Sequence, residues 1–279
     1  MISGTTELIA HLGVPTESFR APLIYNPWFK SKGIDARVVP MGCEIEDYPA
    51  FLPLLFRLRN IRGALVTMPH KVATVALLDV ANSAVLISGS CNAVKRDADG
   101  RLVGDMFDGE GFVRGMLRKG RSVTGSRALV VGSGGVGSGI AASLAKAGVA
   151  AIGLFDTNTP AVDGLADRLR RHCPEIDIQT GSNDPAGWDV VVNATPLGMN
   201  AGDPMPVDVD RIDSAAFVGE VVMKQAETPF LAAARQRGCM TQIGADMLFE
   251  QIPAYLEFFG FPAATSDELR SISRLNYQV

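Results

Sequence analysis

The sequence predicts an α/β protein with two domains, and three observations support that prediction. The chain has 279 residues, enough for two ordinary domains or one large domain. Apolar residues make up 47% of it and charged residues 20%, a balance typical of a globular chain rather than a disordered one. Short β-branched runs alternate with longer amphipathic runs, which is the pattern of proteins with parallel sheets.

In the first hundred residues, strands and helices are expected to alternate. The expected strands are Glu7–His11, Arg37–Met41, Gly63–Thr67 and Ser90–Lys95, and the expected helices are Pro22–Lys32, Ile45–Leu58 and Val72–Leu86. The segment 97–104 predicts a hairpin, because its Asp-Gly pair favours a two-residue turn. These elements indicate one α/β domain.

A second alternation follows a helix that is expected to begin near Asp108. Its expected strands are Arg127–Val131, Ala151–Phe155, Ile176–Gln179, Asp189–Asn193 and Phe217–Gly219. The expected helices are Val136–Ala147, Pro160–His172, Gly244–Phe259 and Ser266–Leu275. The pattern predicts a second α/β domain, after which the helical end of the chain returns to the first.

Charge and hydropathy argue against two function classes. The 26 basic and 30 acidic residues leave a formal net charge of -4, which disfavours a general nucleic-acid binder, although it leaves room for a local basic patch. Segment 1–13 lacks a basic start and contains Glu7 and His11, so no signal peptide is expected. Apolar runs fall short of the ~18 residues of a membrane span, so a cytoplasmic protein without a membrane partner is expected.

The cysteines and histidines predict neither a disulfide framework nor a metal site. The four cysteines are scattered without paired spacing, so ordinary thiols in a reducing compartment are expected. The three histidines lie far apart in the sequence and form no recognisable ligand cluster.

The strongest local signal is the glycine-rich stretch Gly132-Ser-Gly-Gly-Val-Gly137. It follows an apolar strand and opens an alanine-rich helix, the context in which such glycines bind a dinucleotide. Gly132 permits a tight turn, Gly134 lets the backbone approach a pyrophosphate, and Gly137 lets helix and strand pack closely. The helix N-terminus supplies N–H groups and the positive end of its dipole to the phosphates. A tight turn without a ligand is the alternative.

An acidic residue, Asp156, ends the next expected strand 19 residues after Gly137. A carboxylate at this point can accept hydrogen bonds from both ribose hydroxyls and would repel a 2′-phosphate. The sequence therefore predicts NAD as the cofactor, with NADP disfavoured. The alternative role for Asp156 is the N-cap of the following helix.

Six further stretches carry a family resemblance when they are taken together with the glycine turn. They are Val66-Thr-Met-Pro-His-Lys71, Gly89-Ser-Cys-Asn92, Gly104-Asp-Met-Phe-Asp-Gly109, Asn193-Ala-Thr-Pro-Leu-Gly-Met199, Glu227-Thr-Pro-Phe-Leu231 and Gly244-Ala-Asp-Met-Leu-Phe-Glu-Gln251. In this order they resemble the shikimate dehydrogenase family and cover nearly the whole chain. The resemblance implies a dehydrogenase of aromatic amino acid biosynthesis or quinate metabolism that oxidises a secondary hydroxyl of a cyclic hydroxy acid with a nicotinamide cofactor.

The resemblance implies Lys71 and Asp108 as the catalytic pair that flanks the reacting hydroxyl. Oxidation of a secondary alcohol requires loss of the hydroxyl proton as hydride leaves the carbon. A lysine can transfer that proton, and a nearby carboxylate can orient the lysine. The alternative is a surface ion pair. The position of His70 is not catalytic in the family, so a packing or surface role is expected for it.

The same resemblance implies the binding residues. Phe19 and Ala21 stand where the family has two carboxylate-binding serines, and Thr67, Asn92 and Gln251 are expected to hydrogen-bond substrate hydroxyls. The residues expected to border the dinucleotide are Gly132, Gly134, Gly135, Val136, Gly137, Asp156, Thr157, Ala194, Thr195, Pro196, Val221, Met223 and Gly244.

The sequence departs from the family pattern mainly around the substrate. Phe19 and Ala21 lack the serine hydroxyls, and Leu65 replaces an asparagine of the family, so this side of the pocket is expected to be more apolar. Ser18 and Arg20 are the candidate replacement donors. Further departures are Met106 and Phe107, in place of Asn-Thr, and Met223, in place of a tyrosine that reaches the substrate.

A last departure concerns the cofactor. The family's NADP-selecting NRTxxR reads Asp156-Thr-Asn-Thr-Pro-Ala161 here, without either arginine, which again favours NAD.

The resemblance also implies a domain plan. Residues 1–107 are expected to bind substrate, 108–241 to bind NAD, and 242–279 to form helices that pack on the first domain. A small-molecule substrate and a monomer or homodimer are expected. Two alternatives stay open: a catalytically idle homologue that binds NAD or a metabolite, and a methylenetetrahydrofolate dehydrogenase-like enzyme with a similar two-domain plan. Retention of Lys71 and Asp108 argues against the first, and the Asn92 and Asp108 motifs fit the second poorly.

Overall fold

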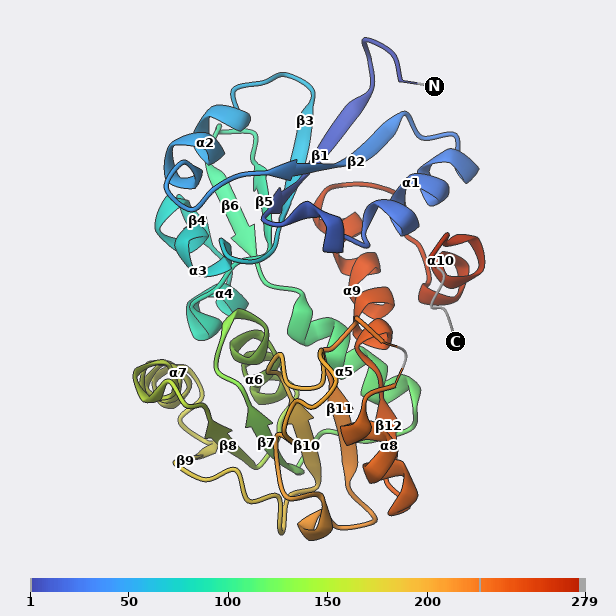
Figure 1. The fold of residues 1–279 in the computed structure, drawn as a ribbon. Coiled ribbons are helices and arrows are strands. Elements are labelled where there is room, and N and C mark those ends of the chain that lie inside the picture. The colour runs from blue at the N-terminus through green and yellow to red at the C-terminus, as the bar shows by residue number, and fades with distance from the viewer. Residues whose placement is uncertain (1, 226, 276–279) are drawn as a thin grey trace. The chain divides into compact units, whose positions relative to one another are not determined.

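Each half of the predicted α/β alternation forms its own six-stranded sheet (Figure 1). The structure is a computed structural model that describes residues 2–225 and 227–275. The chain divides into two units. The first comprises the chain up to Phe107 together with the segment that starts at Ile252, and the second runs from Asp108 to Gln251.

The first unit holds a mixed sheet with the strand order β2-β1-β3-β5-β6-β4. β1 is parallel to β2 and β3, whereas β5 is antiparallel to β3 and β6, so the parallel arrangement expected from the sequence holds only in part. The predicted hairpin accounts for the antiparallel pairing of β5 with β6, because it reverses the chain between them. The strands are β1 (Glu7–Gly13), β2 (Ala36–Gly42), β3 (Ile61–Val66), β4 (Val80–Ala81), β5 (Ala93–Arg96) and β6 (Leu102–Asp105).

The helices of the first unit include one correction to the sequence prediction. The helix expected over Val72–Leu86 is wrong, because its middle forms strand β4 beside β6. Asp79 fixes this interruption: its N–H donates to Leu102 O at 2.9 Å, and its Oδ2 accepts from Leu102 N at 2.7 Å. The helical segments are η1 (Thr16–Ser18), α1 (Pro22–Ser31), α2 (Tyr48–Leu55), α3 (Lys71–Thr74), η2 (Val75–Leu77), α4 (Ser83–Ser88) and α10 (Ser266–Ile272).

The second unit holds a parallel sheet with the order β12-β11-β10-β7-β8-β9. This is the strand order of doubly wound dinucleotide-binding folds, which bind ligands beyond the carboxyl ends of the strands where the order reverses. The reversal lies between β7 and β10. The strands are β7 (Arg127–Val131), β8 (Ala151–Phe155), β9 (Asp177–Thr180), β10 (Val190–Asn193), β11 (Phe217–Glu220) and β12 (Met240–Gln242).

The helices of the second unit alternate along the chain with most strands of this sheet. They are α5 (Asp108–Arg118), α6 (Gly135–Lys146), α7 (Thr159–His172), η3 (Val209–Arg211), α8 (Pro229–Gln236) and α9 (Gly244–Phe258). Helix α8 and strand β12 were not predicted. The start of α8 carries a recognisable signal, since Thr228 caps it by accepting from Leu231 N and Pro229 occupies its first turn.

Helix α9 belongs to both units, so the boundary expected at residue 242 lies too early. The helix is part of the second unit up to Gln251. There it approaches α5 closely, because a Cβ added at Gly111 would lie 2.5 Å from Met247 O and 2.7 Å from Gln251 Cβ.

From Ile252 onward the chain packs in the first unit. Lys95 Nζ donates to Phe258 O at 2.7 Å, and Glu268 of α10 pairs with Lys32 beside α1 at 2.6 Å. The end of the chain therefore returns to the first domain, as the sequence predicted.

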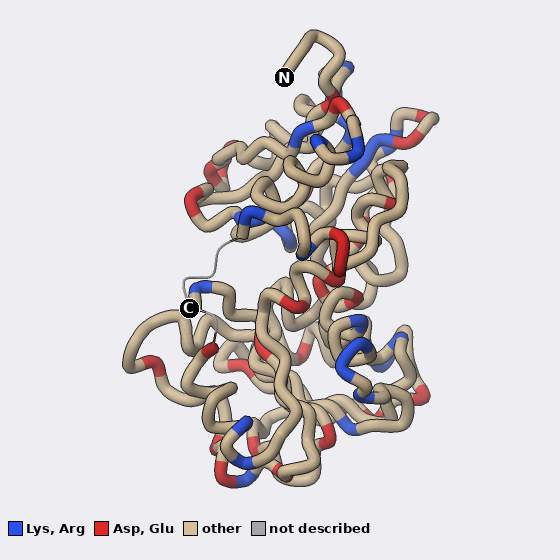
Figure 2. Tube along the Cα trace, turned by 90° about the vertical axis from the view of Figure 1, so that its right-hand side faces the viewer, with Lys and Arg blue, Asp and Glu red and all other residues tan. Residues whose placement is uncertain are grey.

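Charged residues and cysteines are distributed without a dominant feature. Figure 2 shows basic and acidic positions intermixed along the trace of both units. The four cysteines are free and buried. Among the described residues, no helix combines the length and apolar character needed to cross a bilayer. In the described part of the chain, no group of three or more His, Cys, Asp or Glu side chains could hold a metal ion.

Candidate functional site

The glycine turn of the second unit brings three backbone segments into contact. Gly132 has a φ of +107° and donates from its N–H to Phe155 O at 2.7 Å. A Cβ at Gly132 would lie 2.7 Å from the carbonyl carbon of Ala194, and one at Gly137 would overlap Gly132 O. Side chains at these two glycines would push β7, α6 and the segment after β10 apart.

The N-terminus of α6 fits a pyrophosphate. Gly134 is the N-cap, and no atom lies within 4 Å of a Cβ built on it. Gly135 and Val136 form the first turn, and no side chain caps the helix. Ser133 Oγ is buried without a hydrogen-bond partner. A helix N-terminus without a side-chain cap, beside an unpartnered hydroxyl, suits a negatively charged group.

Asp156 lies at the end of β8 and supports the glycine turn. Its Oδ2 accepts from Ser133 N at 2.7 Å, and its Oδ1 accepts from Asn158 N at 2.9 Å. The N-cap of α7 is Asn158 rather than Asp156, so the capping alternative is wrong. Each carboxylate oxygen keeps capacity for a further hydrogen bond, which a ribose hydroxyl can supply. Thr157, the next predicted residue, is exposed.

Asn193 shapes the predicted cofactor-binding segment after β10, and sequence reasoning assigned it no role. It is fully buried, and its Oδ1 accepts from the N–H and from Oγ1 of Thr195, at 3.1 and 2.6 Å. Its Nδ2 donates to Leu197 O at 2.9 Å. These bonds fix Ala194, Thr195 and Pro196 against the glycine turn.

The predicted residues Val221 and Gly244 also lie together. A Cβ at Gly244 would lie 2.8 Å from the carbonyl carbon of Val221, so α9 begins directly beside the end of β11. Met223 follows two residues later and is half-buried. The carboxyl ends of β7, β8, β10, β11 and β12 therefore carry all the predicted dinucleotide residues.

Glu220, the last residue of β11, is a buried acid that sequence reasoning missed. It is fully buried, and its Oε2 accepts from Thr228 Oγ1 at 2.7 Å, whereas Oε1 has no hydrogen-bond partner. Burial raises the pKa of Glu220 to about 7, against the lowering effect of the Thr228 hydrogen bond.

In the first unit, Lys71 and Asn92 lie on neighbouring segments at the carboxyl end of β3. Lys71 begins α3 and is buried, and its carbonyl oxygen accepts from Cys91 N at 2.8 Å. Asn92 is fully buried, and its Oδ1 accepts from Phe107 N at 2.9 Å. Its Nδ2 has no hydrogen-bond partner. A buried amide with an unpartnered donor can bind a substrate hydroxyl.

His70, the neighbour of Lys71, is a packing residue. Its ring stacks on Tyr48 with the centroids 3.9 Å apart, and its Nε2 donates to Cys43 O at 2.8 Å. The ring is buried, so the expected packing role agrees with its contacts.

Phe19 stacks on His11, a buried histidine of β1. The ring centroids are 4.1 Å apart and the rings are inclined by 27°. His11 Nδ1 is buried without a hydrogen-bond partner. Burial, and then the charge of Lys71, lower the pKa of His11 to about 3, so its imidazole is neutral near pH 7. Sequence reasoning missed His11, although a polar residue inside an apolar strand is a signal.

Two departures from the family pattern, Phe19 and Leu65, are neighbours of His11. His11 lies opposite Leu65 of β3 in the sheet register, and Leu65 lies opposite Ala93 of β5. A Cβ at Gly13 would lie 2.5 Å from Thr67 Cγ2 and 3.0 Å from Phe19 Cζ. Thr67 and Phe19 therefore converge at the end of β1.

The candidate replacement donors do not join this group. Ser18 and Arg20 are exposed, and Ser18 Oγ donates to Pro15 O at 3.3 Å. Ala21 is buried at the N-cap of α1, where its methyl group offers no hydrogen bond.

The predicted substrate-side residues are divided between the units. Phe19, Ala21, Thr67, Lys71 and Asn92 lie in the first unit. Asp108 and Gln251 lie in the second, Asp108 as the buried first residue of α5 and Gln251 in α9 with its Oε1 buried and unpartnered.

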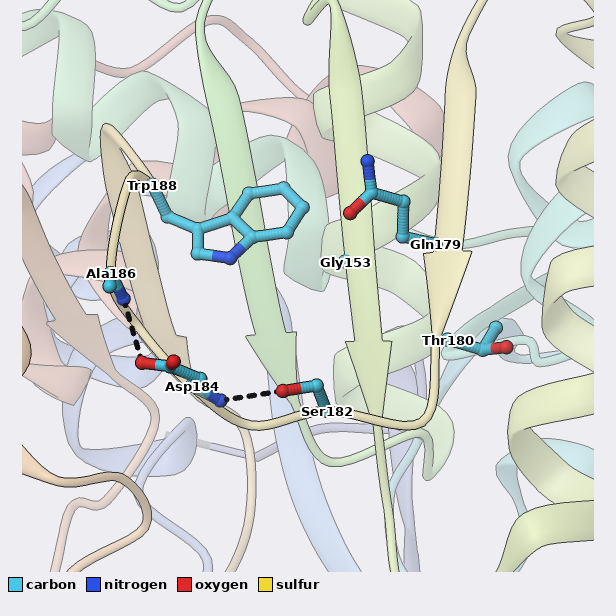
Figure 3. Close-up of a pocket in the computed structure, with 7 residues that line it drawn as sticks. All are labelled: Gly153, Gln179, Thr180, Ser182, Asp184, Ala186 and Trp188. Atoms are coloured by element: carbon cyan, nitrogen blue, oxygen red, sulfur yellow. Dashed lines mark hydrogen bonds between the residues drawn. The ribbon is translucent and has the colours of Figure 1, made fainter.

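A hollow on the second sheet lies apart from these residues. Figure 3 shows Trp188, a residue of the connection from β9 to β10, with its ring beside Gly153 of β8. Asp184 in its wall accepts from Ala186 N at 3.1 Å and pairs with Arg211 at 2.7 Å. The hollow contains none of the site residues predicted from the sequence.

Similarity to known proteins decides the family. A family model described as shikimate dehydrogenase substrate binding domain matches residues 12–94. Shikimate dehydrogenase (NADP(+)) of Rubrobacter xylanophilus is 34% identical, over 90% of this chain and 89% of the relative. The chain belongs to the shikimate dehydrogenase family. The protein of the same name from Rhodospirillum rubrum is 31% identical, over 97% of this chain and 98% of the relative.

Solved structures of shikimate dehydrogenase family members share the fold. Shikimate 5-dehydrogenase from Listeria monocytogenes, in complex with shikimate and NAD, superposes with a TM-score of 0.89 at 25% identity, covering 97% of each chain. Quinate dehydrogenase from Corynebacterium glutamicum, in complex with NAD, gives 0.84 at 26% identity, covering 96% of this chain and 98% of the other. The predicted fold and family are confirmed, and the methylenetetrahydrofolate dehydrogenase-like alternative is dropped.

Proposed function

We propose that this member of the shikimate dehydrogenase family is an NAD-dependent alcohol dehydrogenase. Its substrate carries a secondary hydroxyl on a cyclic hydroxy acid, such as shikimate or quinate, or on a less polar analogue. The observation that carries the proposal is Lys71, a buried lysine whose charge acts on His11 and whose backbone carbonyl accepts from Cys91 N, the neighbour of the buried Asn92. A catalytically idle protein would have no use for a buried lysine in this position.

In this proposal Lys71 handles the proton of the reacting hydroxyl. In the direction of oxidation its neutral amine form takes the hydroxyl proton and becomes an ammonium group, and in the direction of reduction that ammonium group returns the proton to the oxygen. Bound NAD supplies the acceptor for the hydride that leaves the same carbon. Asn92 Nδ2 holds a neighbouring hydroxyl, and Thr67 can hold another. Asp108 keeps the orienting role that the family resemblance implies.

The preference for NAD rests on the residues after β8. Asp156 presents a carboxylate next to the glycine turn, and segment 157–161 contains no lysine or arginine that could balance a 2′-phosphate. The named relatives are NADP-dependent, but two of the structural neighbours were solved with NAD. The negative charge of Asp156, with no basic residue in segment 157–161, supports a preference for NAD over NADP in this chain.

A substrate and cofactor panel tests the proposal. Purified protein is incubated with shikimate, quinate and uncharged cyclic polyols, each with NAD and with NADP, and formation of reduced cofactor is followed by absorbance. Reduction of NAD by at least one of these alcohols is expected. If no alcohol in the panel reduces either cofactor while calorimetry shows NAD binding, the chain is the idle homologue instead.

A further inference from the structure

We propose, on the basis of the proposed function, that the stacked His11 and Phe19 rings determine substrate specificity. They select an uncharged polyol, or the ketone formed from it, that carries a hydroxyl or hydroxymethyl group where shikimate carries its carboxylate. The family resemblance assigns no role to His11, and nothing in the sequence pattern predicted its contact with Phe19.

The position of the ring pair places it on the substrate side of the first unit. Residues on a strand alternate between the two faces of the sheet, and Ala10 and Leu12 belong to the apolar cluster on one face. His11 therefore points to the opposite face, where Leu65 is its neighbour in the register. Phe19 covers His11 and approaches Gly13 and thus Thr67.

The electrostatics of the pair disfavour an anion. The positive charge of Lys71 acts on His11 and favours its neutral form. A second positive charge on His11 is opposed by burial and by Lys71, so the imidazole stays neutral. Phe19, Leu65 and Ala21 add no donor. A carboxylate placed against this wall would lose its hydration and gain at most the single N–H that a neutral imidazole can donate, in place of the two hydroxyl donors of the family pattern.

The same wall accepts an uncharged oxygen. A neutral imidazole donates through one ring nitrogen and accepts through the other, and the tautomer can change to suit the partner. His11 Nδ1 has no hydrogen-bond partner, although the residue is only 8% exposed. The specificity proposal pairs this nitrogen with a hydroxyl of the substrate. Phe19 provides an apolar surface for the carbon skeleton that bears it.

A matched pair of compounds tests this specificity. Methyl shikimate keeps the ring and the hydroxyls of shikimate but loses the negative charge. We expect kcat/KM for the ester to exceed that for shikimate by tenfold or more, with the difference in KM rather than in kcat. If shikimate is the equal or better substrate, the specificity proposal is overturned while the proposed dehydrogenase function stands.

The variant His11→Val tests the role of the histidine itself. Valine suits a buried strand position and removes both ring nitrogens. We expect KM for the ester to rise about tenfold, kcat to change less than KM, and KM for NAD to stay unchanged. An unaltered KM for the ester overturns the role of His11. If the variant does not fold, the comparison of ester and acid in the wild-type protein still decides the selectivity.

Failure of the proposed function gives a different result. In that case neither compound reduces NAD or NADP, and calorimetry detects binding of neither. That outcome overturns both the dehydrogenase function and the specificity that rests on it.

Discussion

The dinucleotide side of the second unit is built mostly from backbone, whereas the substrate side of the first unit is built from side chains. Gly132 and Gly137 approach Ala194 so closely that no side chain would fit, and no side chain caps the N-terminus of α6. In the first unit, Phe19, His11 and Leu65 come from separate segments and meet only in the fold. Many enzymes bind the same cofactor, so its site can keep one backbone shape. Substrate specificity differs between enzymes and can change through single side chains.

The two units also differ in the ionisable group that each of them buries. Burial lowers the pKa of His11 in the first unit to about 3 and raises that of Glu220 in the second to about 7. Both groups are therefore driven towards their uncharged forms. The neutral histidine lies among the substrate-side residues, whereas the acid lies at the end of β11 with Thr228 as its partner.

The largest effect on activity is expected from substitution of Lys71, because this residue is the proposed proton-transfer group. Lys71→Ala should lower kcat by roughly 10²–10⁴-fold, the range for loss of a positioned proton-transfer group. KM for the dinucleotide should change little, because the glycine turn and Asp156 are in the other unit. Steady-state kinetics with the preferred alcohol and NAD measure both values.

Lys95→Ala is the matched control for this variant. Lys95 is a half-buried lysine of the same unit whose Nζ donates to Phe258 O at 2.7 Å. Its loss should lower the melting temperature without a comparable loss of kcat. If Lys71→Ala retains kcat within a few-fold of wild type, Lys71 is not the proton-transfer group.

The next largest effect is expected in the free energy of unfolding, which should depend on pH because of Glu220, the buried acid of the second unit. An ordinary glutamate has a pKa of 4.5, and Glu220 has one of about 7 in the fold. Between these pH values the unfolded chain releases a proton that the folded chain keeps, so stability should fall as pH rises. Glu220→Gln cannot ionise and should be more stable than wild type by roughly 3 kcal/mol above pH 7.

Chemical denaturation at pH 5 and pH 8 measures the Glu220 effect. The two proteins should be similarly stable at pH 5 and should differ at pH 8. Glu227→Gln serves as the control, because Glu227 is exposed and adds only a smaller electrostatic contribution to the pKa of Glu220. Equal pH dependence in wild type and Glu220→Gln would show that Glu220 is ionised in the fold.

Local patterns in the sequence predicted the glycine turn, Asp156 and five of the strands of the second unit, because these depend on neighbouring residues. The helix expected over Val72–Leu86 failed, since pairing of β4 with β6 is a tertiary contact that no local pattern reports. The sequence did not predict the stacking of Phe19 on His11 for the same reason. Its two residues lie on different elements, and only the fold turns them towards each other.

The substrate side can be returned to the family pattern by two substitutions. Phe19→Ser together with Ala21→Ser restores the two hydroxyls and removes the ring that covers His11. KM for shikimate should fall by about tenfold or more, because charge-assisted hydrogen bonds are worth roughly 1.5–3 kcal/mol each. KM for NAD should stay constant as an internal control. An unchanged KM, with efficient wild-type turnover of shikimate, would mean that other groups hold the carboxylate.

The smallest effect is expected in the cofactor preference of the second unit. If repulsion between Asp156 and a 2′-phosphate costs more than about 1.4 kcal/mol, NAD should be preferred over NADP by more than tenfold in kcat/KM. The double variant Asp156→Asn with Thr157→Arg removes the negative charge and introduces a cation at an exposed position, which should reverse the preference.

Asp156 also accepts from Ser133 N at 2.7 Å, so a change at this residue can weaken the glycine turn itself. Thr157→Arg alone is therefore the sharper variant, because it leaves both hydrogen bonds of the carboxylate in place. It should raise kcat/KM for NADP while the melting temperature stays close to that of wild type. Similar efficiencies of wild type with the two cofactors would contradict the NAD preference. In that case side chains other than Asp156 would determine which cofactor the second unit binds.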